Sequence, residues 1–171
     1  MAKIDLRNSV SGATIEKNLA KVSMVGVDNK PGNAAKIFAH LAAAKVSVND
    51  IIQTEVSKEK ANVSFTVSKN DFNDTKKAVE SIKDEVGCQD AFYRDDIAEV
   101  SIIGVGMRTH YGDANIMFST LAKEKINIDS ITTSEIRISC IVDKAQGDKA
   151  LISVCKAFEL DKPVNKRSYV K

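Results

Sequence analysis

Hydrophobic residues in the first half of the chain recur at two different spacings, and the change between them separates strands from helices. Alternation at every second position over residues 22–27 predicts a strand, which is followed by a loop over residues 28–32. Over residues 33–45 the apolar positions form one stripe along an alanine-rich segment, which predicts a helix.

The rest of this half adds two strands, a second helix and a last strand. Residues 48–53 and 62–67 are rich in β-branched side chains and are separated by a polar stretch, which is typical of a hairpin. Residues 71–86 carry apolar side chains at helical steps, and residues 91–94 predict a short strand. The predicted order is β-α-β-β-α-β, the ferredoxin-like unit, whose two helices cover one face of a four-stranded antiparallel sheet.

A second copy of this unit follows. The segment VSMVGV at residues 22–27 returns as VSIIGV at residues 100–105, about eighty residues later, a period that suits a duplicated small domain. When a slightly longer second loop is allowed, residues of the first copy fall on identical residues of the second. The matched positions are Gly32, Ala34, Phe38, Leu41, Ala42, Lys45, Ile51 and Glu55 with, in the same order, Gly112, Ala114, Phe118, Leu121, Ala122, Lys125, Ile131 and Glu135. The second copy therefore predicts a helix over residues 113–125, strands over 128–134 and 136–142, and a helix that ends near Phe158.

The second copy lacks its own last strand. Pro163 and a run of charges argue against an interior strand there, and predict a flexible tail over residues 161–171. Residues 10–16 alternate like a strand and belong to neither copy, so we expect them to complete the second sheet. The predicted fold is α+β, with two ferredoxin-like units in tandem, the first inserted in the second, and antiparallel sheets covered by helices on one face. The expected bounds are residues 21–95 for the first unit, and residues 10–18 together with 98–160 for the second.

The composition is that of a globular protein, with 43% hydrophobic and 28% charged residues. Lys plus Arg number 25 and Asp plus Glu 23, interspersed, so nothing favours a nucleic-acid or anionic membrane partner. The chain has three cysteines, Cys88, Cys140 and Cys155. Because their number is odd and their spacing wide, they predict reduced thiols and a cytoplasmic protein. The first residues contain no apolar leader segment, and no apolar run approaches the eighteen or so residues of a membrane span.

The chain lacks the motifs of phosphate-binding loops, dinucleotide-binding folds, zinc proteases and serine hydrolases. We therefore expect no catalytic residue, metal or cofactor in this chain. His40 is expected to be a partly exposed helix residue, and His110 a loop residue. The alternative is a small ferredoxin-like enzyme with a site at His110, Arg108 and Asp113, which removal of His110 tests.

The loop between the first strand and the first helix is better suited to binding. Its sequence is Asp28, Asn29, Lys30, Pro31 and Gly32, and the helix begins at Asn33 and Ala34. A helix start offers unpaired N–H groups and a positive dipole end to a carboxylate, and Asp28 suits an ammonium group. A free α-amino acid carries both groups. The alternative is a purely structural turn, because turns prefer these residue types.

Four stretches together resemble the tandem ACT domains at the C-terminus of aspartate kinases. They are VDNKPGNAAKIF at residues 27–38, IIQ at 51–53, VSIIGVGM at 100–107 and TSEIRIS at 133–139. The resemblance covers residues 10 to 160 and implies the same ferredoxin-like order. It also implies a regulatory module that binds an end-product amino acid such as threonine or lysine and acts on an aspartate kinase catalytic domain or subunit. Nothing here resembles the kinase's own nucleotide or aspartate site, so ATP and Mg²⁺ would belong to that catalytic part. The alternative is a stand-alone amino-acid sensor that controls another enzyme or a transcription factor.

The resemblance further implies a homodimer with two composite effector sites, each made between one unit and the other unit of a partner chain. The first would combine Asp28, Lys30, Gly32, Asn33, Ala34 and Gln53 with Asn127 and Ile128, and is expected to bind threonine. The second would combine Met107, Thr109, His110, Gly112, Ser134 and Glu135 with Val48 and Asn49.

The second site departs from the family pattern in two places. His110-Tyr111-Gly112 stands where the family has His-Pro-Gly, and Ser47-Val48-Asn49 stands where it has Asn-Ile-Asp. The lost carboxylate is the natural partner of a lysine ε-ammonium, and an unpaired buried cation is unfavourable. Glu135 is a substitute partner. We expect this site to be weak, altered in specificity or vacant.

Overall fold

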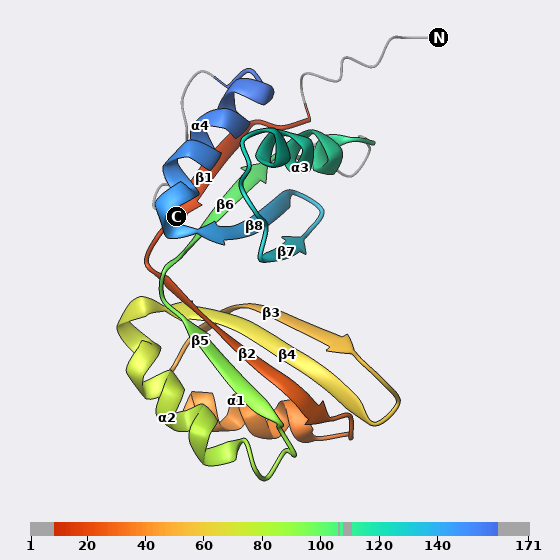
Figure 1. Cartoon of the computed structure of the whole chain (residues 1–171), viewed down its shortest axis with the longest axis vertical. Coiled ribbons are helices and arrows are strands. Elements are labelled where there is room, and N and C mark those ends of the chain that lie inside the picture. Colours follow the sequence, from red (N-terminus) through yellow and green to blue (C-terminus); the bar gives the residue numbers. More distant parts are fainter. Residues whose placement is uncertain (1–8, 106, 108–110, 161–171) are drawn as a thin grey trace. The chain divides into compact units, whose positions relative to one another are not determined.

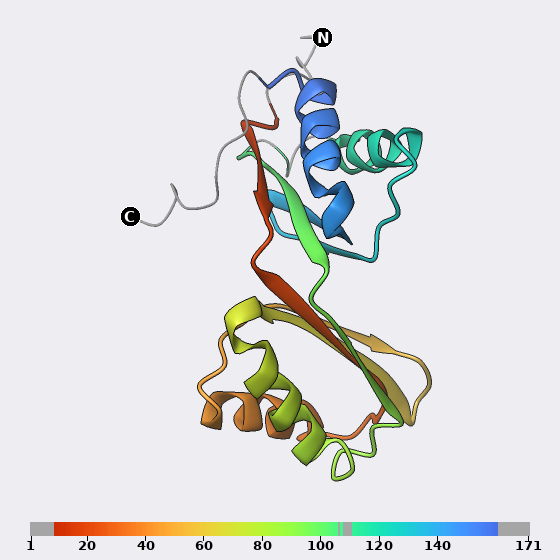
Figure 2. The same cartoon turned by 60° about the vertical axis from the view of Figure 1, so that its left-hand side comes forward.

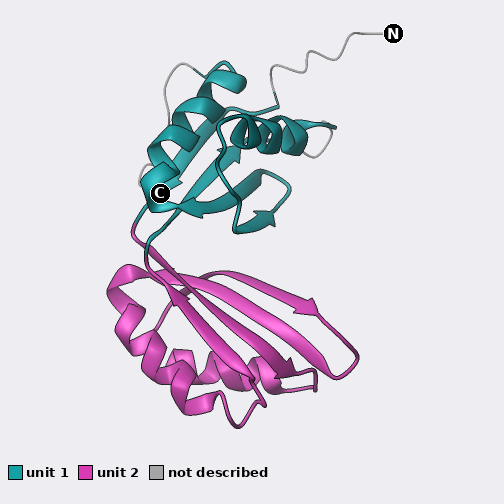
Figure 3. Cartoon of the chain, viewed as in Figure 1, with its two compact units in different colours: residues 1–17, 96–171 teal, residues 18–95 magenta. Residues whose placement is uncertain are grey.

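The computed structural model describes residues 9–105, 107 and 111–160, and it divides them into two compact units (Figure 3). Unit 2 spans residues 18–95, and unit 1 combines the described parts of residues 1–17 and 96–171. Each unit is built on a four-stranded antiparallel sheet. Unit 2 is therefore an insertion within unit 1.

Unit 2 has the order that the sequence predicts. Its elements are β2 (Leu19–Asp28), α1 (Asn33–Ala43), β3 (Val48–Glu55), β4 (Lys60–Ser68), a 3-10 turn (Lys69–Asp71), α2 (Phe72–Ile82) and β5 (Asp90–Arg94). The strand order across the sheet is β3-β4-β2-β5. Figures 1 and 2 show that α1 and α2 lie on the same face of this sheet.

The core of unit 2 lies between that face and the two helices. Met24 of β2, Phe65 of β4 and Ile37 of α1 are each at most 1% exposed, as the alternating pattern predicts. The ring of Phe65 packs edge-to-face on that of Phe38, with centroids 5.8 Å apart. Helix α1 is thereby fixed over β4.

A β-bulge interrupts β2 just before its end. The register to β4 shifts between Met24 and Val27, and Gly26 has a φ of 67°. The Gly26 N–H donates to Oδ1 of Asn62 at 3.0 Å. After the bulge the ladder resumes with Val27 opposite Ala61, and then Asp28 opposite Lys60. The bulge thus determines which residue of β4 faces Asp28.

Unit 1 repeats the architecture with one strand taken from the N-terminal side. Its elements are β1 (Gly12–Glu16), β6 (Ile97–Ile103), α3 (Asp113–Lys123), β7 (Ser130–Thr133), β8 (Arg137–Asp143), a 3-10 turn (Lys144–Gln146) and α4 (Gly147–Ala157). The strand order is β1-β6-β8-β7, and β1 pairs with β6 from Gly12 opposite Ile103 to Glu16 opposite Glu99. The predicted fold class, with one unit inserted in the other, is confirmed.

Some predicted element bounds differ from those observed. Strands β2 and β6 begin at Leu19 and Ile97, earlier than predicted, because the first two residues of each strand are both buried and interrupt the alternation there. Helix α2 ends at Ile82 rather than at residue 86, and residues 83–87 continue as turns in which the Val86 N–H still donates to the Ile82 carbonyl at 3.2 Å. The predicted tail, residues 161–171, lies outside the described residues. Within the described part of the chain, every helix is too short or too polar to cross a membrane.

Candidate functional site

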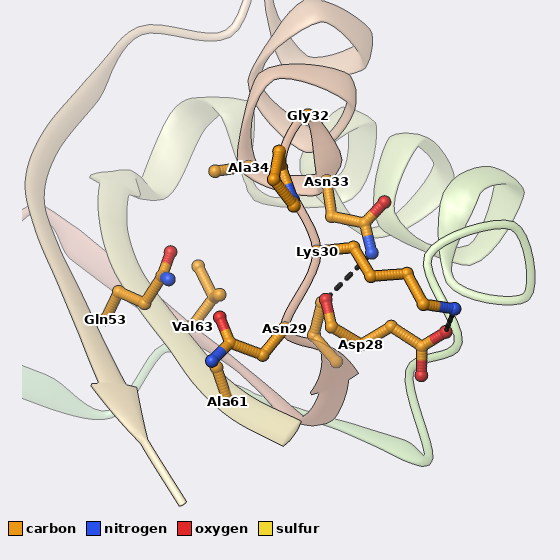
Figure 4. A pocket seen from close by; sticks show the side chains of 11 residues that line it. Asp28, Asn29, Lys30, Gly32, Asn33, Ala34, Gln53, Ala61 and Val63 are labelled. Carbon is orange, nitrogen blue, oxygen red and sulfur yellow. Dashed lines mark hydrogen bonds and ion pairs between the residues drawn. The ribbon is translucent and has the colours of Figure 1, made fainter. Parts of the chain in front are cut away.

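A pocket of about 360 Å³ opens at the start of α1. Its walls come from the β2–α1 loop, β3 and β4 (Figure 4). The lining residues are Val27, Asp28, Asn29, Lys30, Pro31, Gly32, Asn33, Ala34, Gln53, Ala61 and Val63. The structure thus brings together all six residues that the sequence places on the unit 2 side of the first effector site. We refer to this cavity as the α1 pocket.

The backbone of the loop forms an open helix start. Gly32 precedes α1 with a φ of 96°, and among the described residues no side chain caps the helix. The Asn33 side-chain amide instead donates to the carbonyl oxygen of Asp28 at 2.8 Å, which holds the loop closed on itself. First-turn N–H groups such as that of Ala34 therefore stay available to an anion in the pocket.

Asp28 is paired with two cations. Its Oδ2 accepts from Nζ of Lys30 at 2.9 Å, and its Oδ1 accepts from Nζ of Lys60 at 2.8 Å. These hydrogen bonds, that from Lys60 first, hold the pKa of Asp28 at about 2, below its ordinary value of 3.8. Asp28 in turn raises the pKa of Lys30. The carboxylate is therefore ionised at neutral pH.

Figure 4 shows the Asp28 carboxylate directed towards Lys30 and away from Gln53, which stands on the opposite wall beside Val63 and Ala61. The sequence suggested that Asp28 would take the ammonium group of a ligand. The arrangement adds a condition to that role, because an incoming ammonium has to replace or join a lysine already in place.

Sequence reasoning missed Lys60. Lys60 belongs to no motif, and its contact with Asp28 spans 32 positions of the chain. The cross-strand position opposite Asp28 is the one signal that identifies it, and that position depends on the hairpin length and on the bulge at Gly26.

The residues expected to complete the first site from a partner chain are Asn127 and Ile128 of unit 1. Asn127 is exposed, whereas Ile128 is half-buried against the unit 1 core. Both lie between α3 and β7. Asn127 is accordingly free of the core and accessible to a second copy.

The second predicted site draws on the start of α3, where Gly112 has a φ of 122°. Met107 is half-buried against the unit 1 core, and Ser134 and Glu135 are exposed. In unit 2, Val48 is half-buried and Asn49 exposed. Thr109 and His110 lie outside the described residues, as does Arg108 of the alternative enzyme site. Asp113, the third residue of that alternative, is buried, and its Oδ1 accepts from the Ser9 hydroxyl at 2.9 Å.

The ACT domain family model matches this chain twice, over residues 22–85 and 100–158. The aspartate kinase of Stutzerimonas stutzeri is 40% identical over 154 residues, which are 90% of this chain and 37% of that protein. The chain thus spans little more than a third of that relative's length.

Two solved structures have nearly the same extent as this chain. The regulatory subunit of aspartate kinase from Thermus thermophilus has a TM-score of 0.82 and 35% identity, covering 88% of this chain and 99% of that one. A chain in the structure of aspartokinase alpha and beta subunits has a TM-score of 0.82 and 37% identity, covering 89% of this chain and 100% of that one. The protein therefore belongs to the family of regulatory regions of aspartate kinase that are built from tandem ACT domains, which are allosteric amino-acid-binding modules.

Proposed function

We propose that the α1 pocket binds a free α-amino acid, threonine first among them, and that binding inhibits an aspartate kinase by feedback. The observation that carries the proposal is the placement of an uncapped helix start and an ionised carboxylate in one small pocket. A free α-amino acid is a zwitterion, whose carboxylate suits the helix start and whose ammonium suits the ionised carboxylate. The proposed inhibition would operate in the biosynthesis of amino acids made from aspartate.

The opposite wall supports a short, partly polar side chain. Ala61 and Val63 offer apolar contact, and the exposed Gln53 amide offers both a donor and an acceptor. Threonine has a methyl and a hydroxyl on the same carbon, and it matches this combination. A pocket of about 360 Å³ also lies at the small end of the range for ligand sites.

We further propose that the site is completed in a homodimer by Asn127 and Ile128 of a second copy. The open side of the α1 pocket and the exposure of Asn127 support this arrangement. The proposed regulated partner is the catalytic domain or subunit of aspartate kinase, and support comes from the related structure that contains both aspartokinase alpha and beta subunits. Effector binding that favours one arrangement of the units would shift the catalytic part by linkage.

The second site, at the start of α3, is proposed to bind lysine weakly or not at all. Asn49 is exposed and uncharged where the family pattern has the Asp of Asn-Ile-Asp, and Tyr111 is 95% exposed beside Gly112. Neither supplies a partner for an ε-ammonium. Titration calorimetry with lysine at low millimolar concentration tests this proposal, and a clear saturable two-site isotherm would contradict it.

A thermal-shift screen over the twenty amino acids tests the main proposal. A ligand that binds only the folded chain raises its melting temperature by mass action, by several degrees at about 100 times its Kd. Threonine is expected to give the largest shift. Asp28→Asn is expected to abolish that shift, and Asp90→Asn, an exposed change in β5 outside the pocket, to preserve it.

A further inference from the structure

The two lysines that pair with Asp28 at the edge of the α1 pocket differ in how freely their side chains can move. Lys30 has a side chain that is 71% exposed, and its ammonium contacts Asp28. Lys60 has a side chain that is 30% exposed, is anchored in β4, and donates to the Gly87 carbonyl at 3.0 Å as well as to Asp28. Lys60 is therefore the fixed partner of Asp28, and Lys30 the exchangeable one.

The surroundings of Asp28 also fix where a ligand can approach. A Cβ placed on Gly87 would lie 2.6 Å from Cγ of Asp28, so the carboxylate packs directly on the Gly87 backbone. Lys60 covers Oδ1. The remaining oxygen, Oδ2, is the one that Lys30 occupies, and Lys30 lines the pocket whereas Lys60 does not. A ligand ammonium would therefore reach Asp28 by displacing Lys30, which would become free to pair with the ligand's carboxylate.

The fixed cation changes the charge that a ligand meets. Asp28 is the sole acidic residue among those that line the pocket, and Lys60 already neutralises it. Lys30 and the positive end of α1 leave the edge of the pocket with an excess of positive charge. A zwitterion tolerates this excess because it brings its own carboxylate. A second cation on the ligand would find no acidic partner among the lining residues.

We infer that Lys60 is a specificity-determining residue of the α1 pocket, which holds Asp28 in place and makes the pocket select amino acids with uncharged side chains over those with cationic ones. The inference rests on the proposed function and names the residue that sets its ligand class.

The second unit offers an internal comparison. Ser23 and Ser64 face each other across β2 and β4, and Ser101 and Ser139 do so across β6 and β8. Lys60, four residues before Ser64, lies in β4 opposite Asp28, whereas Glu135, four residues before Ser139, precedes β8. Among the described residues the β6–β8 ladder ends at Ile103 opposite Arg137, so the cross-strand pair of Asp28 and Lys60 is a feature of unit 2.

The experiment measures threonine and lysine binding at this pocket alone, through the side-chain amide signals of Gln53 in NMR titrations of the full chain. The wild type is expected to bind threonine about tenfold more tightly than lysine, the size of effect that a nearby charge at a protein surface produces. Lys60→Gln is expected to reduce this preference to about twofold. Lys60→Arg, which retains the cation, and Lys58→Gln, an exposed change on the same hairpin, are expected to keep it.

A second readout needs no ligand. The carboxyl ¹³C signal of Asp28 is expected to titrate at higher pH in Lys60→Gln than in the wild type, and to be unchanged in Lys58→Gln. A threonine preference in Lys60→Gln equal to that in Lys58→Gln, or an unmoved Asp28 titration, would overturn the inference while leaving the proposed function standing. The absence of any Gln53 response to amino acids in the wild type would overturn both.

Discussion

The Ser9 hydroxyl donates to Oδ1 of Asp113 at 2.9 Å, across 104 positions of the chain, and both residues are buried. Asp113 is the first residue of α3, and Ser9 leads into β1. A Cβ on Gly104 would collide with the Ser9 carbonyl, so the two segments pack backbone to backbone. This bond ties the segment before the inserted unit to the start of a helix after it.

We expect Ser9→Ala to lower the free energy of unfolding by about 1–3 kcal/mol, because the buried Asp113 carboxylate loses its donor. The other oxygen, Oδ2, has no hydrogen-bond partner within the described part of the chain, so nothing there compensates. Urea denaturation followed by circular dichroism measures the loss. The control is Ser11→Ala, whose hydroxyl makes an exposed bond to the Ile103 carbonyl. Equal losses in the two variants would contradict the account.

Two glycines with positive φ allow backbone strain to be separated from steric overlap. Gly32 has open space where a Cβ would be, whereas a Cβ on Gly26 would overlap the side chain of Gln89. Gly32→Ala is therefore expected to cost about 1 kcal/mol through strain alone. Gly26→Ala is expected to cost more, because Gln89 must also move. Thermal denaturation of both variants ranks them, and the reverse order would show that Gln89 leaves freely.

The core of unit 2 depends on Phe65. Phe65→Ala is expected to destabilise the protein by about 3–5 kcal/mol, since it removes the ring that packs on Phe38 and leaves a cavity under α1. Phe92, which is 55% exposed on β5, provides the matched control. Phe92→Ala is expected to change the free energy of unfolding by about 0.5 kcal/mol or less. Chemical denaturation of both variants measures the difference.

The ion pairs of Asp28 predict a dependence on pH. The folded-state pKa of Asp28 is about 2, below its ordinary value of 3.8, so its pairing stabilises the fold above about pH 4. That contribution is lost as pH falls from about 4 to about 2. The stability difference between the wild type and Asp28→Asn is therefore expected to shrink across this window. A difference that stays constant between pH 4 and pH 2 would mean that Asp28 is unpaired in solution.

The sequence predicted the order of elements, because hydrophobic spacing distinguishes strands from helices. It also predicted that residues 10–16 join the second sheet, because the internal duplication shows that the second copy lacks one strand. It also predicted which loop residues would gather at the start of α1, since consecutive residues before a helix cannot separate. It did not reveal Lys60, because the contact with Asp28 depends on the length of the β3–β4 hairpin and on one bulge. The end of α2 was also missed, because residues 83–87 keep a helix-like course as turns, with the Val86 N–H donating to the Ile82 carbonyl.

Crystals of the full chain grown with threonine test the central claim most directly. The account predicts electron density for one threonine in the α1 pocket, with its carboxylate at the first-turn N–H groups of α1, that of Ala34 among them, its ammonium on Asp28, and Asn127 of a second copy closing the site. An α1 pocket without threonine at saturating concentration, or threonine bound only elsewhere on the chain, would contradict it.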